Sequence, residues 1–291
     1  MKRWLLAVML VGILIVAAAC SAPKTQPNIV ATTMPVYTFT QALCENTALT
    51  VSHLVQENIS CLHDYTLTVK HMTLLESADL LVISGAGLES FLEDAQLENT
   101  HTIDASHGIK LICGEHTHEH GSEHHHDADP HYWLSVENAM TMAQNIYNGL
   151  VAKYPQHKET LSQNMKTLEA SLQALQEYAV NTLSTLNCRE LITFHDGFAY
   201  MAEDFDLTIL KAIEEESGSE ASAKELVEIC NLITEHDLSA IFTEQNGSES
   251  AATVICRETG ATLYRLDMAI SGNDYFDIMY QNINTLKEAL G

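Results

Sequence analysis

Metal-binding residue types are concentrated in one short stretch of the chain. Residues 115–127 read EHTHEHGSEHHHD, in which six histidines alternate with four carboxylates. They are His116, His118, His120, His124, His125 and His126, with Glu115, Glu119, Glu123 and Asp127. Neutral imidazoles and carboxylates are ligands for zinc and other divalent transition metals. The stretch has no apolar periodicity, so we expect a loop that binds metal weakly, because ordering it costs conformational entropy.

Four further residues have the surroundings that a tight metal site requires. His63 follows one strand candidate, His131 precedes a helix, and His195 and Asp267 end two other strand candidates. Side chains at the carboxyl ends of parallel strands point into the crevice where open α/β sheets bind ligands. Three imidazoles and one carboxylate suit tetrahedral zinc, whereas manganese prefers more oxygen ligands. Glu244, at the end of another strand candidate, or a water is the alternative fourth ligand.

Strands must alternate with helices to position these residues. Strand candidates cover 28–33, 50–55 and 79–84 in the first half, and 190–194, 207–212, 239–243 and 262–267 in the second. Helical patterns lie between them, which predicts parallel sheets with helices on both faces. We therefore expect an α/β fold of two lobes, residues 28–154 and 187–291, each with a central, mostly parallel sheet. The ion would sit between the lobes, since each half supplies two of the four ligands.

One long helix is expected to connect the lobes over residues 155–186. Its apolar residues are spaced by three or four positions and form one stripe: Leu161, Met165, Leu168, Leu172, Leu175, Ala179, Leu183 and Leu186. We expect the stripe to pack along both lobes and to limit hinge motion between them. A short coiled-coil seam between two copies of the chain is the alternative.

The N-terminus is typical of a secreted protein. Lys2 and Arg3 precede an apolar run over residues 5–19, which is short for a membrane span and predicts a signal peptide over residues 1–19. Small residues directly before Cys20 predict a lipidated cysteine, with residues 20–27 as a tether. Cleavage after Ala19 without a lipid is the alternative. Loss of this peptide changes the formal charge from −25 to −27, which argues against nucleic acid as a partner.

The spacing of the other cysteines and the absence of known enzyme motifs argue against other functions. Six cysteines remain after Cys20, and they are either paired in disulfides or free: Cys44, Cys61, Cys113, Cys188, Cys230 and Cys256. No C-x-x-C is present, which disfavours a thiolate zinc ribbon. No H-E-x-x-H or G-x-S-x-G motif is present either, so a zinc hydrolase is disfavoured and we expect no enzyme activity.

Several stretches together resemble one protein family. They are DPHYWLSVENA around His131, FHDGFAYMAEDFDL around His195, and a closing Tyr-x-x-x-Met-x-x-Asn pattern at residues 275–282. In these stretches the chain resembles the metal-specific (zinc/manganese, cluster A-I) solute-binding lipoproteins of bacterial ABC importers, and the resemblance covers nearly all of residues 28–291. It implies that His63, His131 and His195 are ligands and that Asp267 matches the family's carboxylate. Manganese members tend to have Glu where His195 stands, so the resemblance favours Zn²⁺.

The resemblance also implies a role without covalent chemistry. The protein would be a monomer, anchored outside the cell membrane by its lipid, that captures zinc and delivers it to an ABC permease and its ATPase. Manganese or iron in the same role is one alternative, and a surface metal buffer or adhesin without an importer is another. Protons compete with zinc for imidazole, whose ordinary pKa is about 6.5, so we expect zinc affinity to fall steeply below about pH 6.

Overall fold

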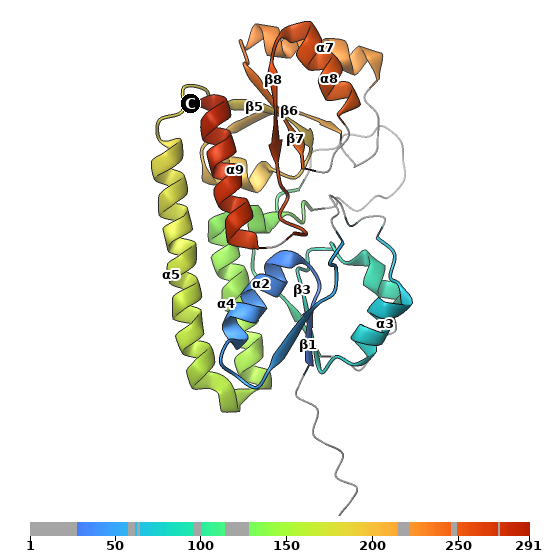
Figure 1. Ribbon diagram of the computed structural model, residues 1–291, viewed down its shortest axis with the longest axis vertical. Helices are drawn as coiled ribbons and strands as arrows, with labels where there is room; N and C mark the ends of the chain where they lie inside the picture. The colour runs from blue at the N-terminus through green and yellow to red at the C-terminus, as the bar shows by residue number, and fades with distance from the viewer. Residues whose placement is uncertain are drawn as a thin grey trace, which may run out of the picture.

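The chain forms two lobes stacked one above the other, with a long helix running along both (Figure 1). The computed structural model describes residues 28–57, 62, 65–95, 101–113, 128–214, 222–245, 249–272 and 274–291. Four of the predicted features lie outside these ranges: the signal peptide with Cys20 and the tether, His63, Cys61, and the His-rich segment 115–127. The two-lobed α/β fold predicted from the sequence is confirmed.

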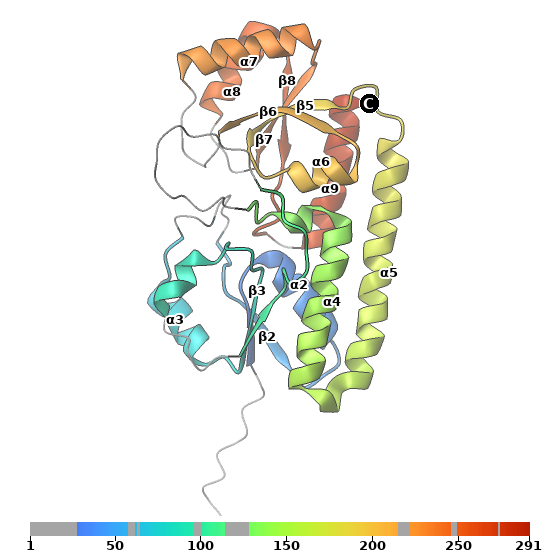
Figure 2. The same ribbon diagram turned by 180° about the vertical axis from the view of Figure 1, so that it is seen from behind.

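The N-terminal lobe is built on a sheet of four parallel strands in the order β2-β1-β3-β4. The strands are β1 (Asn28–Ala31), β2 (Thr50–His53), β3 (Leu80–Ile83) and β4 (His101–Asp104). Helices α2 (Met34–Cys44) and α4 (Val136–Lys153) pack on one side of the sheet, and α3 (Val69–Glu76) lies on the other (Figure 2). Ser135 caps α4, because its hydroxyl accepts the free backbone N–H of Asn138.

The C-terminal lobe repeats this strand order with β6-β5-β7-β8, again all parallel. Its strands are β5 (Glu190–His195), β6 (Thr208–Glu214), β7 (Ala240–Glu244) and β8 (Thr262–Leu266), and its helices are α6 (Ala199–Asp204), α7 (Ala223–Glu235) and α8 (Ser250–Thr259). A capping box formed by Ser222 and Glu225 starts α7. The backbone N–H of Met34, after β1, donates to the carbonyl of Ile270, after β8 (2.9 Å). The carboxyl ends of the two sheets therefore meet at the boundary between the lobes.

Helix α5 (Lys158–Leu183) is the predicted connector. Its 26 residues span about 39 Å, and its apolar stripe is buried against α2 and α4 of the N-terminal lobe and against α9 (Tyr275–Leu290). Because this chain itself covers the stripe, a coiled-coil seam between copies is not needed to bury it. A 3₁₀ turn, η3 (Pro155–His157), precedes the helix. The helix ends at Leu183 instead of residue 186, and the Arg189 guanidinium donates to the Leu183 carbonyl (3.1 Å), one of the carbonyls that a helix end leaves without an intrahelical partner.

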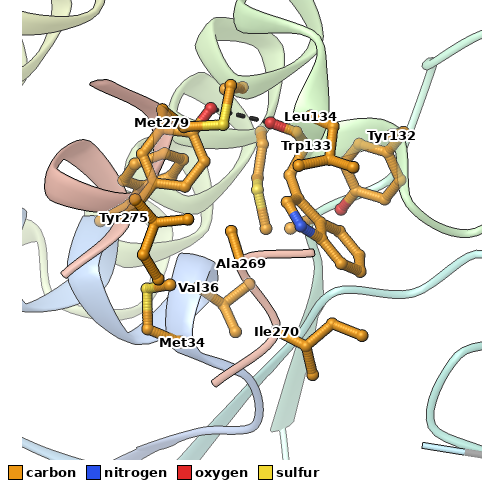
Figure 3. Packing of buried hydrophobic residues seen from close by; sticks show 14 of the residues in the cluster. Met34, Val36, Tyr132, Trp133, Leu134, Ala269, Ile270, Tyr275 and Met279 are labelled. Carbon is orange, nitrogen blue, oxygen red and sulfur yellow. Dashed lines mark hydrogen bonds between the residues drawn. The ribbon is translucent and has the colours of Figure 1, made fainter. Parts of the chain in front are cut away.

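One hydrophobic core extends through both lobes. Figure 3 shows part of it, where Trp133 of the 3₁₀ turn η2 (Tyr132–Leu134) lies close to Ala269 and Ile270. The Trp133 indole N–H donates to the Met268 carbonyl (2.8 Å), and the Tyr275 hydroxyl donates to the Trp133 carbonyl (2.8 Å). A second, smaller core lies beneath α7 and α8 within the C-terminal lobe. The shared core and its buried hydrogen bonds fix the lobes against each other near the predicted ligands.

The described cysteines are all free thiols: Cys44, Cys113, Cys188, Cys230 and Cys256. Of these only Cys44 is buried, and burial raises the pKa of its thiol to about 12. Among the helices of the described ranges, none is both long and apolar enough to cross a bilayer. A further 3₁₀ helix, η1 (Ser90–Ala95), completes the described elements.

Candidate metal centre

His131 is held in its loop by the carboxylate two residues before it. Asp129 Oδ1 accepts the backbone N–H of His131 (2.9 Å) and lies 2.8 Å from His131 Nδ1. An ionised carboxylate can only accept, so Nδ1 carries the proton and Nε2 is left to bind a metal. The side chains of His131 and Asp129 are both shielded from solvent, and His131 is only 3% exposed. The loop thus presents an imidazole whose tautomer and orientation are set before metal arrives.

His195 ends strand β5 and meets His131 across the boundary between the lobes. The two ring centroids lie 5.3 Å apart, and the rings are nearly perpendicular at 85°. Glu244, the last residue of the neighbouring strand β7, has Oε2 3.9 Å from His195 Nδ1. His195 and Glu244 are both buried. Each of the two imidazoles therefore has a carboxylate beside its Nδ1 atom.

Gly197 leaves the space that lets the two imidazoles approach. A Cβ atom at this position would lie 2.9 Å from His195 Cδ2 and 3.0 Å from His131 Nδ1. It would also lie 2.3 Å from the Met268 methyl group, the far end of a flexible side chain. These contacts are shorter than van der Waals packing permits, so any larger residue at position 197 would displace an imidazole, Met268 or both.

Asp267 follows β8 and is fixed by the C-terminal helix. The Asn282 side chain of α9 accepts the Asp267 backbone N–H (2.9 Å) and donates to its carbonyl (2.8 Å). The carboxylate itself accepts the backbone N–H of Ala269 (2.8 Å). Burial raises the pKa of Asp267, and the Ala269 N–H opposes that rise. The closing Asn of the sequence pattern therefore serves to hold the backbone of the predicted carboxylate ligand.

The described residues contain part of the predicted ligand set. The structure brings His131 and His195 together, with Glu244 beside His195. Within the ranges that the structure describes, no three His, Cys, Asp or Glu side chains are grouped closely enough to hold a metal ion. Asp267 is thus not drawn into such a group, and His63 lies outside the described residues. The full set of ligands stays a prediction.

The structure also shows supporting residues that sequence reasoning did not single out. Asp204 of α6 accepts from the Ser135 hydroxyl (3.0 Å) and from the Val136 backbone N–H (2.8 Å), so the C-terminal lobe helps to cap α4. Burial raises the pKa of Asp204. The sequence does indicate a role for Asp129, because this residue stands two positions before the candidate ligand His131 in the D-P-H stretch. It gives no such indication for Asp204 and Gly197, since their roles depend on which segments meet across the lobes.

Known proteins similar to this chain include zinc-binding and zinc-uptake proteins. The high-affinity zinc uptake system protein ZnuA of Bacillus subtilis is 30% identical over 99% of this chain and 98% of its own length. The zinc-binding lipoprotein AdcA of Streptococcus pneumoniae is 30% identical over 93% of this chain, which spans 58% of AdcA. A crystal structure of ZnuA superposes with a TM-score of 0.82 at 26% identity, covering 92% of this chain and all of that one.

The family match extends over nearly the whole described chain. Residues 29–289 match the family described as zinc-uptake complex component A, periplasmic. The match includes both sheets, the connecting helix and both imidazoles that meet between the lobes. Members of this family are solute-binding components of uptake complexes and not enzymes. The chain therefore belongs to the ZnuA family of periplasmic zinc-uptake components.

Proposed function

We propose that this protein captures zinc outside the cytoplasm and delivers it to an ABC-type importer, made of a permease and its ATPase. The observation that carries the proposal is the meeting of His131 and His195, buried imidazoles from different lobes with ring centroids 5.3 Å apart. Neutral imidazole is a preferred zinc ligand, and buried imidazoles beside carboxylates are preorganised for that ion. The family match supports the uptake role.

We propose His63, His131, His195 and Asp267 as the zinc ligands. Glu244 is the rival to Asp267, but it lies on the Nδ1 side of His195, where a carboxylate orients an imidazole that binds metal through Nε2. Leu62, the neighbour of His63, is buried, and its carbonyl accepts the backbone N–H of Tyr65 (3.1 Å). This bond joins the described residues that precede and follow positions 63 and 64 in the sequence.

We also propose the predicted processing and anchoring of the chain. Residues 1–19 would be removed as a signal peptide, Cys20 would carry a lipid, and the protein would act as a monomer tethered to the membrane. AdcA of Streptococcus pneumoniae is named a lipoprotein, which supports this proposal. Replacement of Cys20 by Ala should release the protein from the membrane fraction. A variant that stays in that fraction would contradict lipid anchoring.

The His-rich segment is proposed as an auxiliary, weak collector. The histidines and carboxylates of residues 115–127, together with the acidic surface, would raise the local metal concentration. We expect deletion of residues 115–127 to remove only weak sites and to leave one tight site, because His131 and His195 are held by residues outside the segment. Equal losses of tight zinc in this deletion and in His195→Ala would contradict this division of labour.

The test of the proposed function is a metal competition on the mature chain without its lipid. After complete chelation, zinc, manganese and iron are offered together, and the bound metal is measured. One tightly held zinc ion that neither rival displaces is the expected result. Manganese or iron winning would assign a different cargo to the same fold, and no tight ion at all would contradict the site. Repeating the titration at pH 7.5 and 5.5 should show a steep loss of affinity, because protons compete for imidazole.

A further inference from the structure

We propose that Tyr200 is a positioning residue that sets the spacing between His131 and His195 across the lobe boundary. The proposal rests on the proposed function, since it assumes that these two imidazoles share one zinc ion. Tyr200 lies in α6, which begins four residues after His195, so it belongs to the segment that carries one ligand. Its hydroxyl reaches the loop that carries the other ligand.

The Tyr200 hydroxyl makes two hydrogen bonds to the backbone of the N-terminal lobe. It donates to the carbonyl of Asp129 (2.7 Å) and accepts the backbone N–H of Ile112 (2.9 Å). One hydroxyl supplies one donor and two acceptor sites, so both bonds form at once. A tyrosine hydroxyl is protonated at neutral pH and can donate, and burial raises the pKa of Tyr200 further, to about 12. Tyr200 thus fixes two backbone segments that lie 17 positions apart in the sequence.

These two segments also pair with each other. The backbone N–H of Asp129 donates to the Ile112 carbonyl (2.8 Å), and Cys113 and Ala128 form an antiparallel bridge. The paired segments are therefore joined by their own backbone bonds and clamped to α6 by Tyr200. By sequence, the His-rich residues lie between Cys113 and Ala128. The Tyr200 hydroxyl bonds Asp129, which lies between that bridge and His131 in the sequence.

The contacts then continue to the ligand. Asp129 Oδ1 bonds the backbone N–H and lies 2.8 Å from Nδ1 of His131. The path from Tyr200 through Asp129 to His131 links the two ligand-bearing segments by three hydrogen bonds. Two other hydrogen bonds across the boundary, which Asp204 accepts from Ser135 and Val136, hold the chain after His131. Tyr200 holds the chain before it, so the imidazole is fixed from both sides.

The test compares Tyr200→Phe with Tyr154→Phe as the matched control. Both tyrosines are buried, and both lose only a hydroxyl. The Tyr154 hydroxyl has no hydrogen-bond partner among the described residues, and it lies at the far end of α4, whose 18 residues span about 27 Å. The full mature chain is used, and three quantities are measured for each protein. They are the zinc dissociation constant, the visible spectrum with cobalt(II) in place of zinc, and the unfolding midpoint without metal.

Tyr200→Phe is expected to weaken zinc binding about tenfold and to change the cobalt spectrum, which reports coordination geometry. Tyr154→Phe should match the wild type in both. Unchanged zinc affinity and cobalt spectrum in Tyr200→Phe would overturn the proposal, even if that variant unfolds more easily without metal. If the wild type binds zinc tightly and His195→Ala does not, the proposed function stands whatever Tyr200→Phe shows. A wild type without tight zinc would overturn both.

Discussion

His131 and His195 reach the same place by different structural means. His195 is the last residue of β5, an inner strand bonded to β6 on one side and β7 on the other, so the sheet itself places the imidazole. His131 lies in a loop before η2, and side chains place it, with Asp129 at its ring and Tyr200 behind Asp129. The ligand of the N-terminal lobe thus depends on contacts from the C-terminal lobe. Substitutions that leave both imidazoles intact should therefore disturb the position of the His131 ring more than that of the His195 ring.

The largest expected effect comes from removing either imidazole. The apparent free energy of zinc binding at a structural site is about 10–16 kcal/mol, and we expect loss of the first of four ligands to cost about a quarter of it, about 3 kcal/mol. We expect His195→Ala and His131→Ala each to weaken zinc binding by about two to three orders of magnitude, measured by competition with a chelator. Equal zinc affinity in wild type and His195→Ala would show that the sheet-borne imidazole is not a ligand.

Asp129→Asn should have the next largest effect, because it disturbs only the loop-borne imidazole. The amide keeps the size of the carboxylate but loses the charge that holds the His131 Nδ1 proton. Loss of such a partner typically costs about 10–100-fold in metal affinity. The matched control is Asp104→Asn, whose carboxylate accepts in the same way from Ser106 (2.8 Å) outside the site. Similar zinc affinities for the two variants would contradict the special role of Asp129.

Gly197→Ala should separate the two imidazoles with a smaller cost. The added Cβ would fall 2.9 Å from His195 Cδ2 and 3.0 Å from His131 Nδ1, although Met268 can move aside. We expect zinc affinity to fall about tenfold. Gly149→Ala is the control, because its Cβ would crowd Ile103 (2.4 Å) in the core away from the imidazoles. Gly149→Ala should lose stability and keep its zinc affinity. If Gly149→Ala instead lost zinc affinity and Gly197→Ala kept it, crowding of the imidazoles at Gly197 would be refuted.

His53 sharpens the comparison, since it also ends a strand yet is not a proposed ligand. It stacks on Tyr37 with ring centroids 4.8 Å apart, and burial lowers its pKa to about 4, although Glu57 opposes this. The folded pKa lies below the unfolded value of 6.5, so the neutral ring contributes stability above pH 6.5 that is lost as the pH falls toward 4.

We expect His53→Gln to remove this pH dependence without changing zinc affinity at pH 7. The free energy of unfolding of the metal-free wild type, relative to the variant, should fall by about 1–2 kcal/mol between pH 7 and 4, after allowance for partial exposure. Denaturant titrations at both pH values measure it. A constant difference between the two proteins would contradict a half-buried neutral His53, and a loss of zinc affinity would make it part of the site.

Periodicity predicted the fold where one face of an element is buried. The stripe on α5 repeats at the spacing that burial of one helix face imposes, and the continuous apolar run of β3 indicates a strand buried on both faces. Strand β4 was missed, because its residues HTID are mostly exposed and carry no apolar alternation. His131 and His195 were predicted from their places beside a helix and at a strand end. The roles of Gly197 and Asn282 could not be, because they depend on distances between segments that are far apart in the sequence.

The central claim is that His131 and His195 bind one shared ion across the lobe boundary. A double-mutant cycle tests it most directly, with zinc dissociation constants for the wild type, His131→Ala, His195→Ala and the double variant. We predict strong non-additivity, because the second substitution removes a ligand from a site that the first has already broken. The double variant should bind zinc about as weakly as either single one. Additive losses would show that the two imidazoles act at separate sites, and would contradict the shared ion.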